Sequence, residues 1–167
     1  MGAGAMVFGS PKNRMRGSLS RVEALRRAVD FFRYAGDAAT AAGTVMCVEP
    51  NPAGYGGDFL LTTEEAAELV YLVDNPGVRL NLDLGELIMN QADVYRSVTD
   101  YLPLAGHFHC SEPMLAPFNI KTEAHKQAAA ALKEADYQGI VSLEMKVPAG
   151  GLPAVHQAIL DMRRIYA

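Results

Sequence analysis

Two histidines separated by one residue, His107 and His109, lie in the segment GHFHCSEP. Imidazole nitrogens bind divalent metal ions, but a single histidine on a strand is more often a structural residue with a hydrogen-bond partner. Carboxylates occur in three other short apolar segments, as Glu49 in TVMCVEPN, Asp83 in VRLNLDLG and Glu144 in GIVSLEMK. Two Glu, one Asp and one His would form an oxygen-rich ligand set for a divalent cation.

These segments belong to a regular alternation of short β-type runs and helical patterns. Each run ends in a turn-rich loop, and each loop leads into a helix. Capping boxes predict two of the helix starts, Ser20 with Glu23 and Thr62 with Glu65. An alanine-rich helix is expected to stop at Gly139, and the last helix to follow Pro153. Strands that alternate with helices favour a parallel sheet built of βα units.

The strands have one apolar face and one face that becomes polar toward the C-terminal end. In VRLNLD, Asn81 and Asp83 share the face opposite the two leucines, and His107 shares a face with His109. An open sheet with helices on both sides would have two apolar faces, whereas a closed barrel has polar strand ends at one mouth. The pattern therefore predicts a β/α barrel in which Glu49, Asp83, His109 and Glu144 converge.

Three converging carboxylates would repel one another unless a cation lies between them. We therefore interpret Glu49, Asp83, His109 and Glu144 as a metal site. The alternative is that each carboxylate is a helix cap or a solvated loop residue. Cys110 lies on the opposite face from His109 and is expected to pack in the core.

Composition excludes several classes of protein. The chain has 167 residues and a net charge of −4, so it offers no global basic field for a nucleic acid. No apolar run approaches the roughly 20 residues that a membrane span requires. Two cysteines and a start without signal-peptide features favour a cytoplasmic protein.

Five segments resemble the successive strand-end motifs of the xylose-isomerase-like TIM barrel superfamily, and most closely its sugar phosphate isomerase/epimerase group. They are VFGSPKNR, VEPNPAGYGGDFLLTTEEA, LNLDLGEL, GHFHCSEP and SLEMK, in the family's order. The resemblance implies a (β/α)8 barrel of which these segments are strands four to eight. Such a barrel typically needs about 250 residues. We therefore expect residues 1–167 to form a single incomplete TIM-barrel domain of about five βα units.

The resemblance also implies roles for individual residues. The family's metal ligands fall on Glu49, Asp83, His109 and Glu144, and the ion would be Mn, Mg, Co or Zn. The two glutamates would also be the catalytic acid–base pair. His107 and Lys146 are expected to bind substrate, although a solvated lysine is an equal reading of Lys146. Lys12 or Arg14 could bind an anionic substrate group, or lie in a solvated loop.

Two substrate contacts of well-studied epimerases are replaced in this chain. Glu86 stands in place of a histidine and Leu115 in place of an arginine, so the resemblance does not identify the particular sugar. The function expected is that of a metal-dependent isomerase or epimerase that acts on a sugar or a sugar phosphate by proton transfer next to a carbonyl. The alternatives are a related polyol-ketone dehydratase and a non-enzymatic remnant that keeps the metal site. An apurinic endonuclease is disfavoured by four histidines and an acidic balance. Two unpaired sheet edges further predict a homo-oligomer.

Overall fold

A computed structural model describes residues 2–167. Five parallel strands form one sheet in the order β1-β2-β3-β4-β5. Their bounds are β1 (Ala5–Phe8), β2 (Val45–Val48), β3 (Val78–Asp83), β4 (Ala105–Ser111) and β5 (Val141–Glu144). The helices are α1 (Arg21–Ala41), α2 (Thr63–Val73), α3 (Leu84–Met89), α4 (Val94–Tyr101), α5 (Glu123–Glu134) and α6 (Gly151–Tyr166). Short 3-10 turns follow three strands and precede one, at Pro11–Arg14, Ala53–Tyr55, Pro113–Leu115 and Leu102–Leu104.

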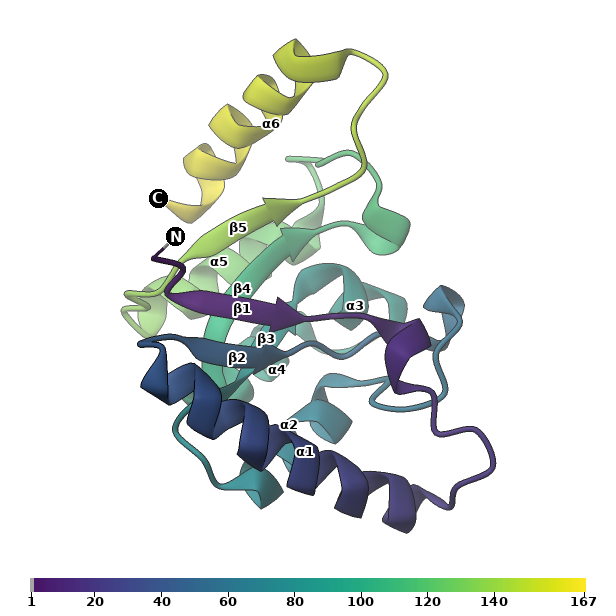
Figure 1. Cartoon of the computed structure of the whole chain (residues 1–167). Helices are drawn as coiled ribbons and strands as arrows, with labels where there is room; N and C mark the ends of the chain where they lie inside the picture. Colours follow the sequence, from purple (N-terminus) through teal and green to yellow (C-terminus); the bar gives the residue numbers. More distant parts are fainter. Residues whose placement is uncertain (1) are drawn as a thin grey trace.

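The sheet curls into a half-barrel with the helices outside it (Figure 1). Strand β1 approaches β4 across the inside of the curl. Side chains on that inside face are therefore buried, as Cys47 and Asn81 show. The alternation of five strands and helices confirms the predicted partial TIM barrel.

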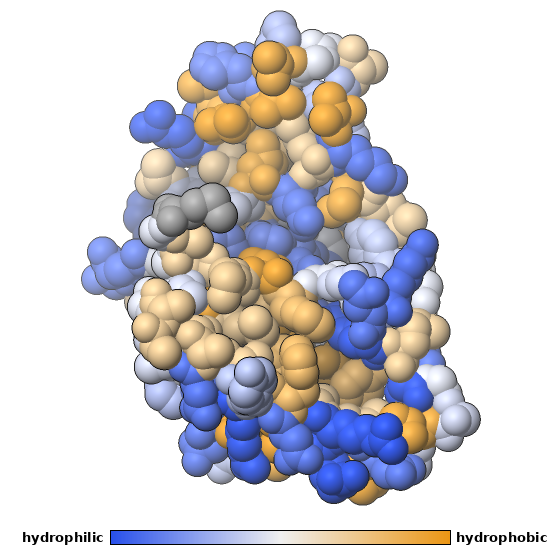
Figure 2. All heavy atoms as spheres, viewed as in Figure 1, coloured by the Kyte–Doolittle hydropathy of each residue, from blue (hydrophilic) through white to orange (hydrophobic). Residues whose placement is uncertain are grey.

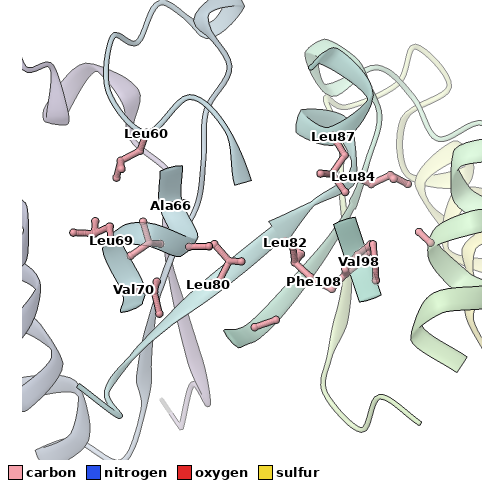
Figure 3. Close-up of a cluster of buried hydrophobic side chains, with 14 of the residues drawn as sticks. Leu60, Ala66, Leu69, Val70, Leu80, Leu82, Leu84, Leu87, Val98 and Phe108 are labelled. Atoms are coloured by element: carbon pink, nitrogen blue, oxygen red, sulfur yellow. The ribbon is translucent and has the colours of Figure 1, made fainter. Parts of the chain in front are cut away.

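The main core lies between the outer face of the sheet and the helices. Leu80 of β3 points toward Leu69 of α2, and Leu82 lies near Phe108 of β4 (Figure 3). All four side chains are fully buried. Burial of each such side chain stabilises the fold by roughly 1.5–3 kcal/mol, and together they hold the strands in the register that aligns their C-terminal ends.

Both predicted capping residues lie at helix starts. The Ser20 hydroxyl accepts a hydrogen bond from the Glu23 amide, and Thr62 accepts one from Glu65, both at 3.2 Å. The Glu65 carboxylate accepts from the amide of Leu61 rather than that of Thr62. Each cap satisfies an amide that the first turn would leave unpaired, and so defines where its helix begins.

The prediction that the alanine-rich helix stops at Gly139 was wrong. Helix α5 ends at Glu134, and Asp136 takes the left-handed conformation, with φ of 49°. The amide of Tyr137 closes the end on the carbonyl of Leu132 at 3.0 Å, and its ring packs against the core. The last helix begins slightly early, at Gly151, with Pro153 in its first turn.

The surface combines polar and apolar areas. Figure 2 shows apolar side chains over α6 and near the middle of the molecule, where β1 lies. Ile159 of α6, Met6 of β1 and Phe31 of α1 are each more than one third exposed. Among residues 2–167, no helix combines the length and apolar character needed to cross a membrane.

Candidate metal centre

The four residues predicted to bind a metal come together at the C-terminal ends of four neighbouring strands. Glu49 follows β2, Asp83 ends β3, His109 lies in β4 and Glu144 ends β5. One potential ligand atom from each lies within 4.8 Å of the others. This convergence follows from the parallel register, which pairs Asp83 with His109 and places Glu144 beside Ser111.

The imidazole of His109 lies among the three carboxylates. Its Nδ1 atom is 3.0 Å from Oε1 of Glu49, 3.1 Å from Oε2 of Glu144 and 3.7 Å from Oδ2 of Asp83. Burial lowers the pKa of His109, but hydrogen bonds to Asp83, Glu144 and Glu49 outweigh it and raise the pKa to about 11. The cluster thus favours a positive charge at its centre. A divalent cation fits this donor set of three carboxylates and one imidazole.

Two asparagine side chains hold the carboxylate of Glu49. Asn81 Nδ2 donates to Oε1 at 3.2 Å, and Asn51 Nδ2 donates to Oε2 at 3.3 Å. Gly9, just after β1, packs directly against the same carboxylate. Sequence analysis did not predict that Asn51 and Asn81 hold Glu49. The role of Asn81 could have been found, because strand alternation places it on the same face as Asp83.

Asp83 has a structural contact in addition to its place in the cluster. Its Oδ1 accepts from the amide of Glu86 at 2.7 Å and so caps α3, while Oδ2 accepts from the Ser111 hydroxyl at 2.9 Å. The two readings of this residue, a helix cap and a member of the polar cluster, are therefore compatible. The cap fixes the orientation in which Oδ2 faces His109.

The predicted substrate-binding residues lie outside the immediate cluster. His107 is one pleat below His109, with ring centroids 5.1 Å apart, and burial is the larger of two causes that lower its pKa. The Lys146 side chain is exposed, and its amide donates to the carbonyl of Leu115. The role of each in substrate binding stays a prediction.

The basic residues after β1 differ from each other. Lys12 is exposed, whereas the guanidinium of Arg14 donates to the backbone carbonyls of Phe8 and Glu49. Burial lowers the pKa of Arg14 to about 10, although the Glu49 charge acts in the opposite direction. Arg14 therefore ties the end of β1 to the end of β2.

Cys110 is fully buried in the hydrophobic core, as expected from strand alternation. Burial raises the pKa of its thiol to about 12. Behind it, Glu112 Oε1 accepts hydrogen bonds from His125 Nε2 at 3.0 Å, from the Asn119 amide and from the Thr122 hydroxyl. This buried network, which sequence analysis missed, fastens the loop after β4.

The two residues that stand in place of expected substrate contacts, Glu86 and Leu115, have different surroundings. Glu86 is 1% exposed, and its carboxylate accepts from the amide and hydroxyl of Thr63 and from Asn90. It therefore caps α2. Leu115 instead lines a cavity beside the cluster.

That cavity has a volume of about 230 Å³. It opens at the C-terminal mouth of the half-barrel, where the loops after β1, β2 and β4 meet the polar cluster. Its wall includes Glu49, Asp83, Glu144, Asn51, Tyr55 and Leu115. Three of the four clustered side chains are thus accessible to a small molecule.

The curled sheet of five parallel strands, alternating with helices, has the architecture of a partial TIM barrel. The model of the family described as "Xylose isomerase-like TIM barrel" matches residues 1–166. The chain belongs to this family.

Solved structures with the same fold include sugar epimerases. D-Psicose 3-epimerase from Clostridium cellulolyticum H10 is 19% identical, with a TM-score of 0.78 over 89% of this chain and 58% of its own. The 3-keto-D-glucoside 4-epimerase YcjR from E. coli is 21% identical, with a TM-score of 0.80 over 95% and 60%. The IolI protein, solved with a binding zinc atom, is 18% identical, with a TM-score of 0.65 over 98% and 60%.

These likenesses concern the fold, because sequence identities are low. The chain spans about three fifths of the length of each of these three proteins. A search of curated proteins found no match.

Proposed function

We propose that this chain carries the metal and proton-transfer site of a sugar isomerase or epimerase. One divalent ion, Mn²⁺, Mg²⁺, Co²⁺ or Zn²⁺, would be held by Glu49, Asp83, His109 and Glu144. The observation that carries the proposal is the convergence of these four ligand atoms within 4.8 Å beside an open cavity. The zinc atom in the structure of the related IolI protein supports it.

Proton transfer next to a carbonyl needs a carboxylate within hydrogen-bond reach of the substrate carbon. Glu49 and Glu144 come from strands β2 and β5, on two sides of the cluster, and both line the cavity. We assign them as the acid–base pair, as in the family's epimerases. When bound, a divalent cation would supply the positive charge that stabilises negative charge developing on a substrate oxygen.

The Glu49 carboxylate would be held in the orientation needed for proton transfer by its contacts with Asn51, Asn81 and Gly9. The two amides hold one oxygen each, which limits the rotation of the carboxylate. A base that is fixed before substrate binds loses less freedom in the reaction.

We also propose that residues 1–167 form one unit equivalent to strands four to eight of a complete barrel. In the sheet order, β1 and β5 are edge strands, and an edge strand presents unpaired backbone groups. A homo-oligomer would cover these edges. A small sugar, and neither a nucleic acid nor a membrane, would be the partner at the site.

Calorimetric titration of chelator-treated protein with Mn²⁺ tests the metal site. We expect one equivalent to bind, and His109→Ala to weaken binding at least tenfold. His107→Ala, which removes an imidazole one pleat away, is the matched control and should change the affinity less than threefold. Absence of metal binding by the parent protein would exclude the proposed function.

A further inference from the structure

A second cavity lies between the loop after β1 and the first half of α1. It has a volume of about 270 Å³, and the segment before α2 closes one side of it. Figure 2 shows apolar side chains bordered by strongly hydrophilic ones over this region. None of the four clustered residues of the candidate metal centre lines it, so it is a separate site.

Aromatic rings form much of the apolar wall of this cavity. The ring centroids of Phe31 and Phe32 are 5.1 Å apart at an interplanar angle of 80°, and those of Phe8 and Phe32 are 5.4 Å apart at 88°. Phe59 adds a fourth ring. Phe32 is 3% exposed, whereas Phe31 is 49% exposed. A further aromatic ring in the cavity would extend this edge-to-face packing and remove Phe31 from water.

The charged side chains of the cavity are all basic. Arg14, Arg16 and Arg27 line it, and no aspartate or glutamate among residues 2–167 does so. The whole chain has a net charge of −4, so this excess of positive charge is local. A guanidinium group binds a carboxylate or a phosphate through two parallel hydrogen bonds. The wall therefore favours an anionic ligand.

The three arginines differ in their contacts. The guanidinium of Arg14 donates to the carbonyls of Phe8 and Glu49 and is part of the wall. Arg16 and Arg27 are exposed, and neither forms an ion pair with a carboxylate of residues 2–167. Two guanidinium groups thus remain for an anionic group at the mouth of a cavity with aromatic walls.

We propose that this cavity binds a small aromatic anion, that is, a planar ring that carries one phosphate or carboxylate group. The ring packs against Phe31 and Phe32, and the anionic group binds the guanidinium groups of Arg16 and Arg27. The site goes beyond the proposed function and does not depend on it, because it shares no side chain with the metal cluster.

An NMR titration of the chelator-treated chain with phenyl phosphate at low ionic strength tests this site. Inorganic phosphate provides the anion without the ring, and phenol provides the ring without the anion. We expect phenyl phosphate to bind at least tenfold more tightly than either, with the largest amide shifts in residues 13–16 and 24–32. Equal affinities for phenyl phosphate and inorganic phosphate, or shifts confined to other segments, would overturn the inference.

Removal of one charge tests the role of the arginines. We expect Arg27→Gln to weaken the binding of phenyl phosphate at least fivefold and that of phenol less than twofold. Arg26→Gln is the matched control, because Arg26 does not line the cavity and pairs with Asp30 at 3.4 Å. It should change either affinity less than twofold. Equal effects of the two variants on phenyl phosphate would show only a general attraction between charges and would contradict the site.

Filling the cavity tests the role of its volume. Ala28 lines the cavity and is half-buried, so Ala28→Leu would occupy part of the space and leave all three arginines in place. We expect this variant to weaken phenyl phosphate binding at least fivefold. Ala38→Leu, at an exposed position of the same helix, should have no effect. If Ala28→Leu and Arg27→Gln both bind phenyl phosphate as the parent does, the ligand does not occupy this cavity and the inference is wrong.

Discussion

A Cβ atom placed on Gly9 would lie 1.7 Å from Oε2 of Glu49. Two non-bonded heavy atoms cannot remain at that distance, so a larger residue at position 9 must displace the Glu49 side chain. The displaced atoms would be those that Asn51, Asn81 and His109 hold in place. The glycine is thus a condition for the position of the carboxylate.

We expect Gly9→Ala to weaken Mn²⁺ binding at least tenfold, because Glu49 can leave the cluster more easily than the backbone can move. The midpoint of thermal unfolding of the chelator-treated protein should fall by no more than a few degrees. Gly4→Ala is the matched control, since a Cβ there meets nothing within 4 Å. Unchanged metal affinity in Gly9→Ala would mean that Glu49 is not a ligand.

Substitution of the two glutamates tests their proposed catalytic role. Glu49→Gln and Glu144→Gln should each lower turnover of a ketose substrate by a factor of at least 100, because a neutral amide cannot accept the proton. Denaturant unfolding should show that both variants remain folded. Activity retained in both variants would exclude them as the acid–base pair.

The buried carboxyl of Glu86 predicts a dependence of stability on pH. Burial is the main cause that raises its pKa to about 7, against the lowering effect of hydrogen bonds from Thr63 and Asn90. The folded chain therefore holds this proton more tightly than the unfolded chain does. The stabilisation is complete below the unfolded pKa near 4.5 and is lost as the pH rises through 7.

Glu86→Gln keeps the shape and the acceptor for the Thr63 amide but does not ionise. Relative to the parent, we expect its free energy of unfolding to increase between pH 5 and pH 8 by on the order of 2 kcal/mol. The measurement is urea unfolding with chelator present, so that metal binding does not contribute. A difference that is the same at both pH values would contradict the raised pKa.

Sheet edges and apolar surface predict self-association. Met6, on edge strand β1, is 42% exposed, and Ile140, next to edge strand β5, is 63% exposed. Light scattering at micromolar concentration should give a mass of at least twice 18.0 kDa. Met6→Lys should lower that mass, whereas Tyr71→Lys on α2 should not. A monodisperse monomer of the parent chain would contradict this prediction.

Residue patterns in the sequence predict much of the fold, because the faces of strands and helices follow from the local periodicity of apolar residues. Alternation along VRLNLD and GHFHCSEP predicts which side chains of β3 and β4 share a face, and the parallel register then brings Asp83 to His109. The predicted end of α5 was wrong. Glycine is the usual residue in the left-handed position after a helix, which pointed to Gly139, but in the structure Asp136 takes that conformation and the next residue, Tyr137, packs against the core.

Contacts of individual side chains could not be predicted in the same way. The sequence indicates a basic loop residue at Arg14, yet its guanidinium donates hydrogen bonds to two backbone carbonyls. Glu86 caps a helix that begins 23 residues earlier in the chain. Such contacts depend on side-chain direction between distant segments, which periodicity does not encode.

The two glutamates of the cluster differ in their access to water. The side chain of Glu49 is 9% exposed and held by two amides, whereas that of Glu144 is 39% exposed at the sheet edge. In the proposed reaction, a proton taken up by Glu144 would exchange rapidly with solvent, while one taken up by Glu49 would be partly retained. Deuterium from heavy water should then enter product unequally in the forward and reverse directions. The difference in exposure between Glu49 and Glu144 would thus appear as a difference in deuterium content between the products of the forward and reverse reactions.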